Sequence, residues 1–301
     1  MLLEHELAAP PAEGCLAELD RSAEPWAIEP RRAGLVSGVR EVWRYRHLLR
    51  YFGVRALQKR YKRTVLSWLW LFIRPLGPIL IGTLIFGRLL NVPSDNVPYF
   101  LFFLAGTASW HLFENSLLWA TRSLERNRRF MTKLYFPRII LPVASIVPAL
   151  IEFLIYLGLI LGAVVYYLSA EGKLYLVLRF QLLLAPAAAA LIVVFALALG
   201  LWTSVLQAQA RDVRFTLRYV MRFWLYLTPV IYPLSSIPPR WHWLVSLNPM
   251  APLVETFKWG MLGVGQFKPY FLVTAVAVIC STLASGLWFF DRAQASAIDR
   301  L

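Results

Sequence analysis

Long apolar runs dominate the pattern of hydrophobic and polar positions along this chain of 301 residues. A helix needs about 20 consecutive, mostly apolar residues to cross the hydrocarbon core of a bilayer. Six stretches reach that length, at about 65–90, 99–120, 137–168, 180–206, 216–234 and 269–290. The pattern therefore predicts an all-α integral membrane protein with six transmembrane helices.

A further semi-apolar stretch, 241–264, lies between the fifth and sixth predicted spans. It is interrupted or flanked by Pro238, Pro239, Pro249 and Pro252, and proline inside a helix removes a backbone donor. Irregular backbone at membrane depth is tolerated only where protein or a water-filled cavity covers it. We expect two short helices between spans five and six that are re-entrant, dipping into the bilayer, or lie on its surface, and no seventh full span.

Residues 37–63, before the first span, have the period of an amphipathic helix. Its apolar face consists of Val42, Tyr45, Leu49, Phe52 and Ala56. The other face is mostly basic, which fits the cytoplasmic interface, where anionic lipid headgroups attract Lys and Arg. We predict an amphipathic cytoplasmic interface helix. The alternative, a helix of a soluble bundle, is less favoured because the sequence offers no soluble domain for it to pack on.

Composition and charge refine this organisation. Apolar residues make up 58% of the chain and charged residues 16%, against about 45–50% and 25% in globular domains. The N-terminal stretch is acidic, contains prolines and lacks a sustained period, so it predicts a flexible tail. We expect an acidic cytoplasmic tail at 1–36, the interface helix at 37–63 and a transmembrane domain at 64–301.

Basic residues tend to stay on the cytoplasmic side of a membrane. With both termini inside, the predicted cytoplasmic segments carry 24 Lys and Arg, against five in the predicted outer loops. Those cytoplasmic segments are 1–63, 121–138, 207–222 and 291–301. This asymmetry favours six spans with both termini cytoplasmic, and it accounts for the net charge of +14 without a nucleic-acid partner.

No catalytic motif is evident. The sequence lacks GxxxxGK[ST], HExxH and a nucleophile elbow, its four histidines are scattered, and its two cysteines form no metal-type cluster. We therefore expect no catalytic residue, no metal site and no cofactor bound by this chain. A membrane protein of this kind most often moves or gates something.

Several segments resemble ABC type-2 permeases, the membrane subunits of bacterial O-antigen and other polysaccharide exporters. The five segments are RYKRTVLSWLWLFIRPL (60–76), GTASWHLFENSL (106–117), KLYFPRIILP (133–142), QARDVRFTLRYVMRFWLYLTPVIYPLSSIP (209–238) and LNPMAPLVETFKWGML (247–262). The similarity covers about 37–300, in order, and the last three of these segments are the most specific.

The resemblance implies a location in the bacterial inner membrane and a homodimer of two six-span copies. A separate cytoplasmic ABC ATPase dimer would bind ATP and Mg²⁺ and supply the energy. The substrate class it implies is an undecaprenyl-linked glycan of the O-antigen type. It also implies that the first and fifth spans line a central channel, with 235–268 as a periplasmic gate.

The loop between the second and third predicted spans is short, charged and amphipathic. Together with the match at KLYFPR, this favours coupling to the ATPase over plain cytoplasmic charge. We predict coupling contacts at Glu125, Arg126, Arg128, Arg129, Lys133 and Tyr135. Arg211 and Asp212 form either a lesser coupling contact or merely a local ion pair. The apolar docking positions of this loop would be Leu124, Phe130, Met131 and Leu134.

Channel candidates come from the first and fifth spans, because sugars stack on aromatic faces and arginine pairs with phosphate. They are Trp68, Arg74, Tyr226 and Tyr232. For Arg74, snorkelling to the interface is an equal alternative. The gate candidates are Trp241, Trp243, Asn248 and Pro249, although the two tryptophans also fit plain interface anchors.

Two acids lie inside predicted spans, Glu114 and Glu152. A proton relay that includes His111 is one interpretation, and interhelical hydrogen bonding is favoured over it. For the whole chain, the alternatives to O-antigen export are export of a capsule or teichoic-acid-type polymer, a membrane-embedded glycosyltransferase and a secondary transporter.

Overall fold

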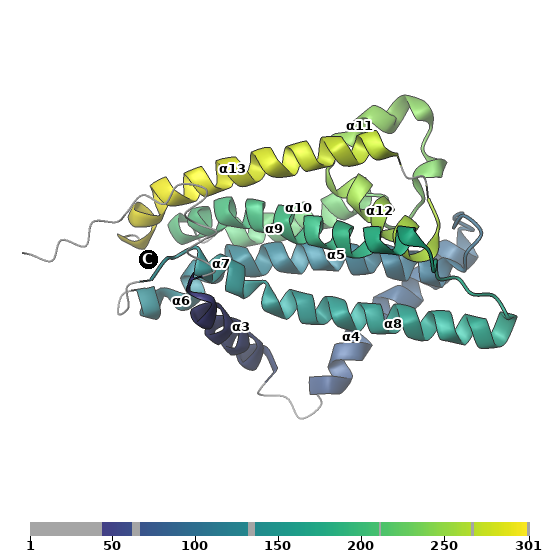
Figure 1. The fold of residues 1–301 in the computed structure, drawn as a ribbon, viewed down its shortest axis with the longest axis horizontal. Coiled ribbons are helices and arrows are strands. Elements are labelled where there is room, and N and C mark those ends of the chain that lie inside the picture. The colour runs from purple at the N-terminus through teal and green to yellow at the C-terminus, as the bar shows by residue number, and fades with distance from the viewer. Residues whose placement is uncertain (1–43, 62–66, 132–135, 211, 266–267, 300–301) are drawn as a thin grey trace, which may run out of the picture. The chain divides into compact units, whose positions relative to one another are not determined.

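The structure, a computed structural model, describes residues 44–61, 67–131, 136–210, 212–265 and 268–299, all within one compact unit, 34–301. Every element in these ranges is helical, as the sequence predicts (Figure 1). The α-helices are α3 (Arg46–Tyr61), α4 (Ser67–Gly82), α5 (Tyr99–Thr121), α6 (Ser123–Met131), α7 (Ile140–Ser145), α8 (Val147–Glu171), α9 (Leu184–Gln209), α10 (Val213–Leu227), α11 (His242–Ser246), α12 (Met250–Leu262) and α13 (Pro269–Asp299). The short helices are η1 (Thr83–Leu89), η2 (Phe180–Leu183), η3 (Leu234–Ser236) and η4 (Pro239–Trp241).

Four helical stretches are long and apolar enough to cross a bilayer. They are Phe72–Leu89, Ile140–Glu171, Phe180–Gln209 and Pro269–Ala293. They correspond to the first, third, fourth and sixth predicted spans. The chain is therefore a membrane protein, and these four predicted spans coincide with helices of suitable length and composition.

The second and fifth predicted spans coincide with α5 and α10, which do not meet the same measure. α5 has 23 residues, but polar residues such as His111, Glu114 and Asn115 lower its hydropathy. α10 has 15 residues and carries three arginines. A total of six spans stays a prediction.

Helix α5 lies at the centre of the bundle and packs against α8, α9, α12, α10 and α4. Its residues are buried on every side, and small side chains such as Ala105 and Ala108 allow close helix approach. The Ser109 hydroxyl donates back to the carbonyl of Ala105 at 3.1 Å. Burial on every side makes α5 the core helix of the bundle, and its neighbours pack around it.

The stretch predicted as two short helices contains α11 and α12, separated at Asn248 and Pro249. Their insertion into a bilayer stays a prediction. Helix α13 continues to Asp299, nine residues beyond the predicted end of the sixth span, so the predicted C-terminal cytoplasmic segment is mostly helix.

A second core cluster joins helices from distant parts of the sequence, and we call it the α3–α6 cluster. Phe52 of α3 packs between Phe130 and Phe136, with ring centroids 5.8 and 5.4 Å away. Arg55 lies over the Phe130 ring at 4.0 Å. The buried members are Phe52, Leu124, Phe136, Ile140, Leu141, Ala144, Leu201, Val205, Ala208 and Phe290.

This cluster changes two interpretations of the sequence. The apolar face of α3 packs on protein, with Tyr45 and Leu49 against the cluster, so that face is not left for lipid. Leu124 is 1% exposed, and Phe130 and Met131 pack beside it. The prediction that Leu124 is a docking position is therefore wrong, because α6 packs there against α7 and α9 and leaves Leu124 buried.

The tail 1–36 and residues 37–43 and 62–63 of the predicted interface helix lie outside the described residues. The three-part division of the chain stays a prediction.

Candidate functional site

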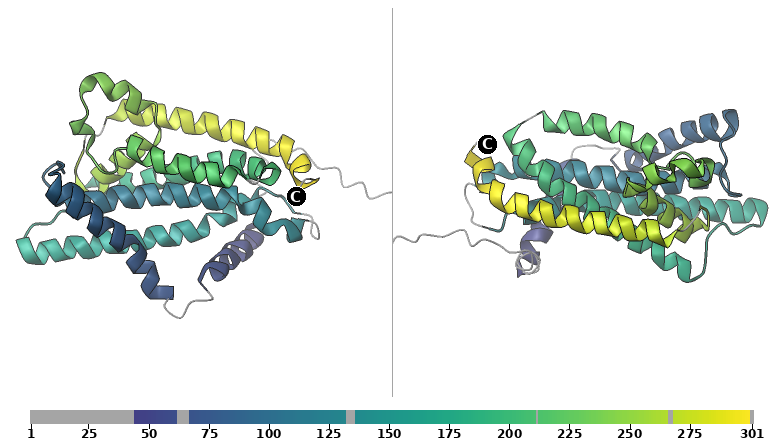
Figure 2. Two further views of the ribbon diagram at one scale, coloured as in Figure 1. Left: turned by 180° about the vertical axis from the view of Figure 1, so that it is seen from behind. Right: turned by 90° about the horizontal axis from the view of Figure 1, so that it is seen from above.

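Helix α10 presents an exposed face of aromatic and arginine side chains. Leu217, Met221 and Trp224 face the bundle, with Met221 fully buried. The opposite face is exposed and lies along one edge of the bundle (Figure 2). We call the aromatic and arginine members of this face the α10 stripe: Phe215, Arg218, Tyr219, Arg222, Phe223 and Tyr226; Thr216, Val220 and Leu227 are also exposed on α10.

The aromatic members of the stripe are among the more exposed large side chains of the molecule. Phe223 is 71% exposed and Tyr226 is 62% exposed. The guanidinium of Arg222 lies 5.8 Å from the Tyr219 ring centre, so cation and ring share one surface. Such a surface offers flat faces for stacking and forked donors for phosphate oxygens.

The chain leaves the helix at the end of α10 because of Thr228 and Pro229. Proline favours extended backbone in the residue before it, and Thr228 has φ −101° and ψ 137°. The following residues, 228–232, pass over α5 without helical hydrogen bonds. We call them the 228–232 segment.

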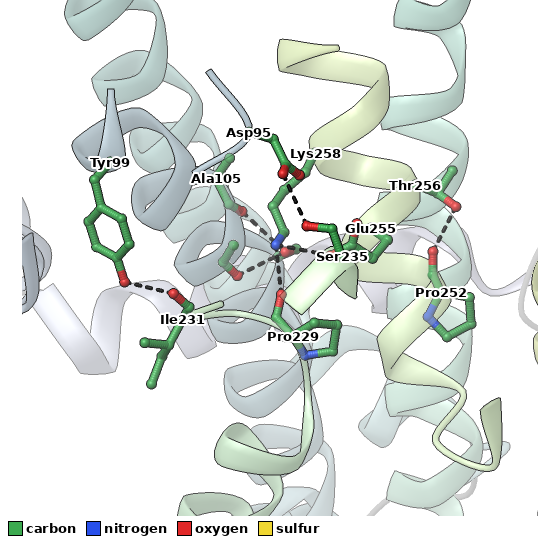
Figure 3. Close-up of polar contacts among 12 residues, drawn as sticks. Asp95, Tyr99, Ala105, Pro229, Ile231, Ser235, Pro252, Glu255, Thr256 and Lys258 are labelled. Atoms are coloured by element: carbon green, nitrogen blue, oxygen red, sulfur yellow. Dashed lines mark hydrogen bonds and ion pairs between the residues drawn. The ribbon is translucent and has the colours of Figure 1, made fainter. Parts of the chain in front are cut away.

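Side chains satisfy the backbone carbonyls that this turn leaves open. The Tyr99 hydroxyl of α5 donates to the Ile231 carbonyl at 2.7 Å, and Lys258 Nζ of α12 donates to the Pro229 carbonyl at 2.6 Å (Figure 3). The Tyr232 hydroxyl donates to the Tyr226 carbonyl at 2.9 Å. Unpaired polar backbone is unfavourable in an apolar environment, so these donors stabilise the turn.

Asn248, a predicted gate residue, links α10, the 228–232 segment and α12. Its side-chain oxygen accepts from Trp224 Nε1 at 2.9 Å and from the Met250 amide at 3.0 Å. Its side-chain nitrogen donates to the Thr228 hydroxyl at 2.9 Å. Both the oxygen and the nitrogen of the Asn248 side-chain amide are therefore hydrogen-bonded.

Glu255 and Lys258 form a buried ion pair on α12, with Lys258 Nζ 3.3 Å from Glu255 Oε1. Both side chains are almost fully buried. Helix α12 lies outside the four stretches that could span the membrane. Burial raises the pKa of the Glu255 carboxyl, and the positive charge of Lys258 opposes that rise. Burial likewise lowers the pKa of the Lys258 ammonium, and Glu255 opposes that change.

Gly106 of α5 lies directly against the 228–232 segment. A Cβ at Gly106 would be 2.7 Å from the Val230 carbonyl oxygen and 3.3 Å from the Val230 Cα. Contacts under 3.0 Å to backbone force a displacement. Only glycine therefore lets the segment approach α5 this closely.

The predicted coupling residues divide into two groups. Glu125 and Arg126 contact their own chain: Glu125 accepts from Gln207 at 3.2 Å and lies 3.9 Å from Arg214, and Arg126 lies over the Trp119 ring at 4.1 Å. The other described residues of the set are exposed, namely Arg128, Arg129 and Asp212. Lys133, Tyr135 and Arg211 lie outside the described residues.

The Glu125–Arg214 contact joins α6 to the start of α10, next to Asp212. Coupling contacts were predicted both in α6 and at Asp212, and the two segments are neighbours in the structure. Their role in coupling stays a prediction.

The channel candidates are not all brought together in one copy. Arg74 is exposed on α4, which packs on α5 and α8, whereas α10 packs on α5 and α9. Tyr226 and Tyr232 are joined by the bond described above. The side chain of Trp68 lies outside the described residues.

The two gate tryptophans are exposed, Trp241 at the end of η4 and Trp243 on α11. Pro249 is buried directly before α12. Among the gate candidates, Asn248 is a hydrogen-bonding link between helices.

Of the two acids inside predicted spans, Glu152 takes part in interhelical bonding, the interpretation that the sequence favoured, whereas Glu114 contacts His111 on its own helix, α5. Asn115 Nδ2 of α5 donates to Glu152 Oε2 of α8 at 2.9 Å. Glu114 lies 3.5 Å from His111, whose ring stacks on Tyr156 of α8 at 5.6 Å.

Sequence reasoning missed the roles of Lys258, Glu255, Tyr99 and Gly106. Lys258 and Glu255 lie in 235–268, the segment expected to form a gate, but neither was among the gate candidates. A usable signal was present, because two opposite charges stand three residues apart in the otherwise apolar run of α12. That spacing places them on one helix face.

Comparison with known proteins gives a family match. The model of a family described as "ABC-2 type transporter" matches residues 47–262. The O-antigen export system permease protein RfbA of Myxococcus xanthus is 27% identical over 260 residues, which cover 85% of this chain and 96% of that protein.

Two further relatives match over shorter regions. An O-antigen export system permease protein RfbA of Klebsiella pneumoniae is 25% identical over 202 residues, covering 67% of this chain and 75% of that protein. The polysialic acid transport protein KpsM of Escherichia coli is 23% identical over 209 residues, covering 67% and 76%. All three are named for the export or transport of a carbohydrate polymer.

Proposed function

This chain belongs to the ABC-2 type transporter family, and we propose on that premise that it is the permease subunit of a bacterial polysaccharide exporter. The observation that carries the proposal is the α10 stripe, supported by relatives named for O-antigen and polysialic acid transport. The substrate we propose is a lipid-linked polysaccharide of the O-antigen type.

The chemistry of the α10 stripe suits such a substrate. The exposed faces of Tyr219, Phe223 and Tyr226 offer stacking surfaces for sugar rings along two turns of the helix. Arg218 and Arg222 offer forked donors for the phosphates that link a glycan to its lipid carrier. Aromatic side chains alone would serve as an ordinary lipid-facing surface, so the paired arginines favour the glycan.

A second copy of the chain completes the path. Arg74 on α4 and the stripe on α10 are both exposed, and within one copy their helices pack on different neighbours. A homodimer lets α4 of one copy face α10 of the other around a shared channel. In that arrangement Arg74 also contacts the phosphates of the substrate.

Energy for export comes from a separate ABC ATPase dimer, which binds ATP and Mg²⁺. It docks from the cytoplasm on α6 and the start of α10, where Arg128, Arg129 and Asp212 are exposed. The excess of basic residues in the predicted inner loops supports an inner-membrane location with both termini cytoplasmic.

The first prediction tests the function itself. Deleting the gene for this chain should lower surface polysaccharide at least tenfold while lipid-linked polymer accumulates inside the cell. Intact and lysed cells are compared by immunoblot for the polymer, and the wild-type gene should restore display. A deletion strain that contains no polymer in either fraction would instead favour a glycosyltransferase.

The second prediction tests coupling at α6. Replacing Arg128 and Arg129 with glutamate should lower export at least fivefold and abolish polymer-stimulated ATP hydrolysis, because the introduced carboxylates would repel an acidic ATPase surface that the two arginines attract. Export is measured by surface display, and ATP hydrolysis is measured in the purified complex.

The matched control for this charge reversal is the pair Lys173→Glu and Arg179→Glu, two exposed cations in the connection between α8 and α9. This variant should export normally. If the α6 variant also exports and hydrolyses ATP normally, α6 carries only the charge that fixes topology.

A further inference from the structure

Lys258 occupies an unusual position for a lysine. Its side chain is 0% exposed, and its ammonium has three kinds of partner. It donates to the Pro229 carbonyl at 2.6 Å, contacts Glu255 Oε1 at 3.3 Å and lies 3.9 Å from the centre of the Phe102 ring. A buried charge is tolerated only when it is paired and hydrogen-bonded, and Lys258 meets both conditions.

These partners belong to three different parts of the fold. Phe102 is on α5, Glu255 is on α12, and Pro229 is in the 228–232 segment that follows α10 (Figure 3). The segment contributes a backbone carbonyl that no helical amide reaches. A cation near the C-terminal end of a helix is also favoured by the helix dipole. Lys258 therefore stabilises the end of α10 from the side of α12.

The Glu255 side chain is buried and closely surrounded. Its Oε2 atom lies against Gly265, where a Cβ would clash with it and where φ is +92°. Asp95, in the loop before α5, adds a second negative charge near Lys258 and accepts from the Ser235 hydroxyl at 3.1 Å. The ion pair thus lies where the loop before α5, the chain after α10 and α12 converge.

The segment has little freedom to move while these contacts hold. Tyr99 fixes its far end at Ile231, Gly106 allows it to lie on α5, and Lys258 fixes its near end at Pro229. Val230 between them is 1% exposed. Moving the segment away from α5 would break the hydrogen bond between the Lys258 ammonium and the Pro229 carbonyl.

We propose that Lys258 is a positioning residue that fixes the 228–232 segment, and with it the end of the α10 stripe, to α12 and α5. The role of the stripe in glycan export rests on the proposed function, whereas the fixing itself does not. In transport, α12, the segment and the end of α10 then move together as one body.

The experiment measures how well Val230 is protected. A Val230→Cys variant is made in a background with Cys15→Ser and Cys280→Ser, the two native cysteines of the chain. The full-length protein, with its ATPase, is labelled by a maleimide in open membrane fragments, so that both sides are accessible. Adding Lys258→Met should raise the labelling rate at position 230 at least tenfold.

Two matched variants separate positioning from general packing. Lys258→Arg keeps the charge and the donors, so the labelling rate should stay within twofold of the parent. Thr256→Val alters a buried polar residue of the same helix whose hydroxyl donates only to the Pro252 carbonyl one turn earlier, and it should also leave position 230 protected.

A second cysteine, at the fully buried Leu201 in the α3–α6 cluster, reports general unfolding. The proposal requires that Lys258→Met exposes position 230 while position 201 stays protected. Unchanged labelling at 230, or equal exposure of both positions, overturns it. Because labelling needs no transport, failure of this test is distinguishable from failure of the proposed function.

Discussion

Replacing Gly106 with alanine is expected to lower export at least tenfold while the protein still reaches the membrane. The added Cβ would lie 2.7 Å from the Val230 carbonyl oxygen. The 228–232 segment is fixed at both sides of that point, so it has no easy direction in which to move. Overpacking a tight contact typically costs about 1–3 kcal/mol, and here the displacement falls on the end of the α10 stripe.

Gly158→Ala is the matched control, because a Cβ at Gly158 in the middle of α8 would meet nothing within 4 Å. Both variants make the same chemical change inside a helix, but Gly106 is buried whereas Gly158 is exposed. Surface polysaccharide is measured alongside the amount of protein in the membrane. Gly106→Ala exporting as well as Gly158→Ala would show that the close contact is dispensable.

Replacing Tyr219 and Phe223 together with leucine is expected to lower export at least fivefold. Leucine keeps the surface apolar but removes the flat rings on which sugars stack. Arg218→Gln and Arg222→Gln, added together, should lower export by a similar factor because they remove donors for phosphate oxygens. The assay is surface display in cells, with complex assembly checked by co-purification of the ATPase.

The corresponding control lies on α13, where Tyr270 and Trp288 are 58% and 55% exposed. Replacing both with leucine removes a similar area of exposed aromatic surface and should leave export within twofold of wild type. Equal losses in the two double variants would mean that the aromatic residues act as general membrane anchors, which is contrary to a path along α10.

Hydropathy predicted the helices well because it is a local property. Each of the six apolar stretches contains a helix, and the proline-interrupted stretch 241–264 contains the two short helices α11 and α12. α5 and α10 were recognised as helices but do not meet the hydropathy and length measure for spanning. The polar residues of α5 bond to other helices and the arginines of α10 lie on an exposed face, and a hydropathy average over neighbouring residues does not represent either arrangement.

Burial against distant residues was the part that the sequence could not supply. Leu124 was expected at a docking surface, yet Phe52, more than seventy positions earlier, belongs to the cluster that covers it. Lys258 was not among the predicted site residues, although it is buried in contact with Pro229 and Phe102. In both cases the deciding contact joins residues far apart in sequence, and periodicity carries no record of such contacts.

The α3–α6 cluster has a mechanical consequence. Phe52, Phe130 and Phe136 interlock there with residues of α7, α9 and α13, and close-packed protein interiors have low compressibility. If the ATPase displaces α6, as the proposed function requires, this packing would transmit the displacement to α9 and α13 together.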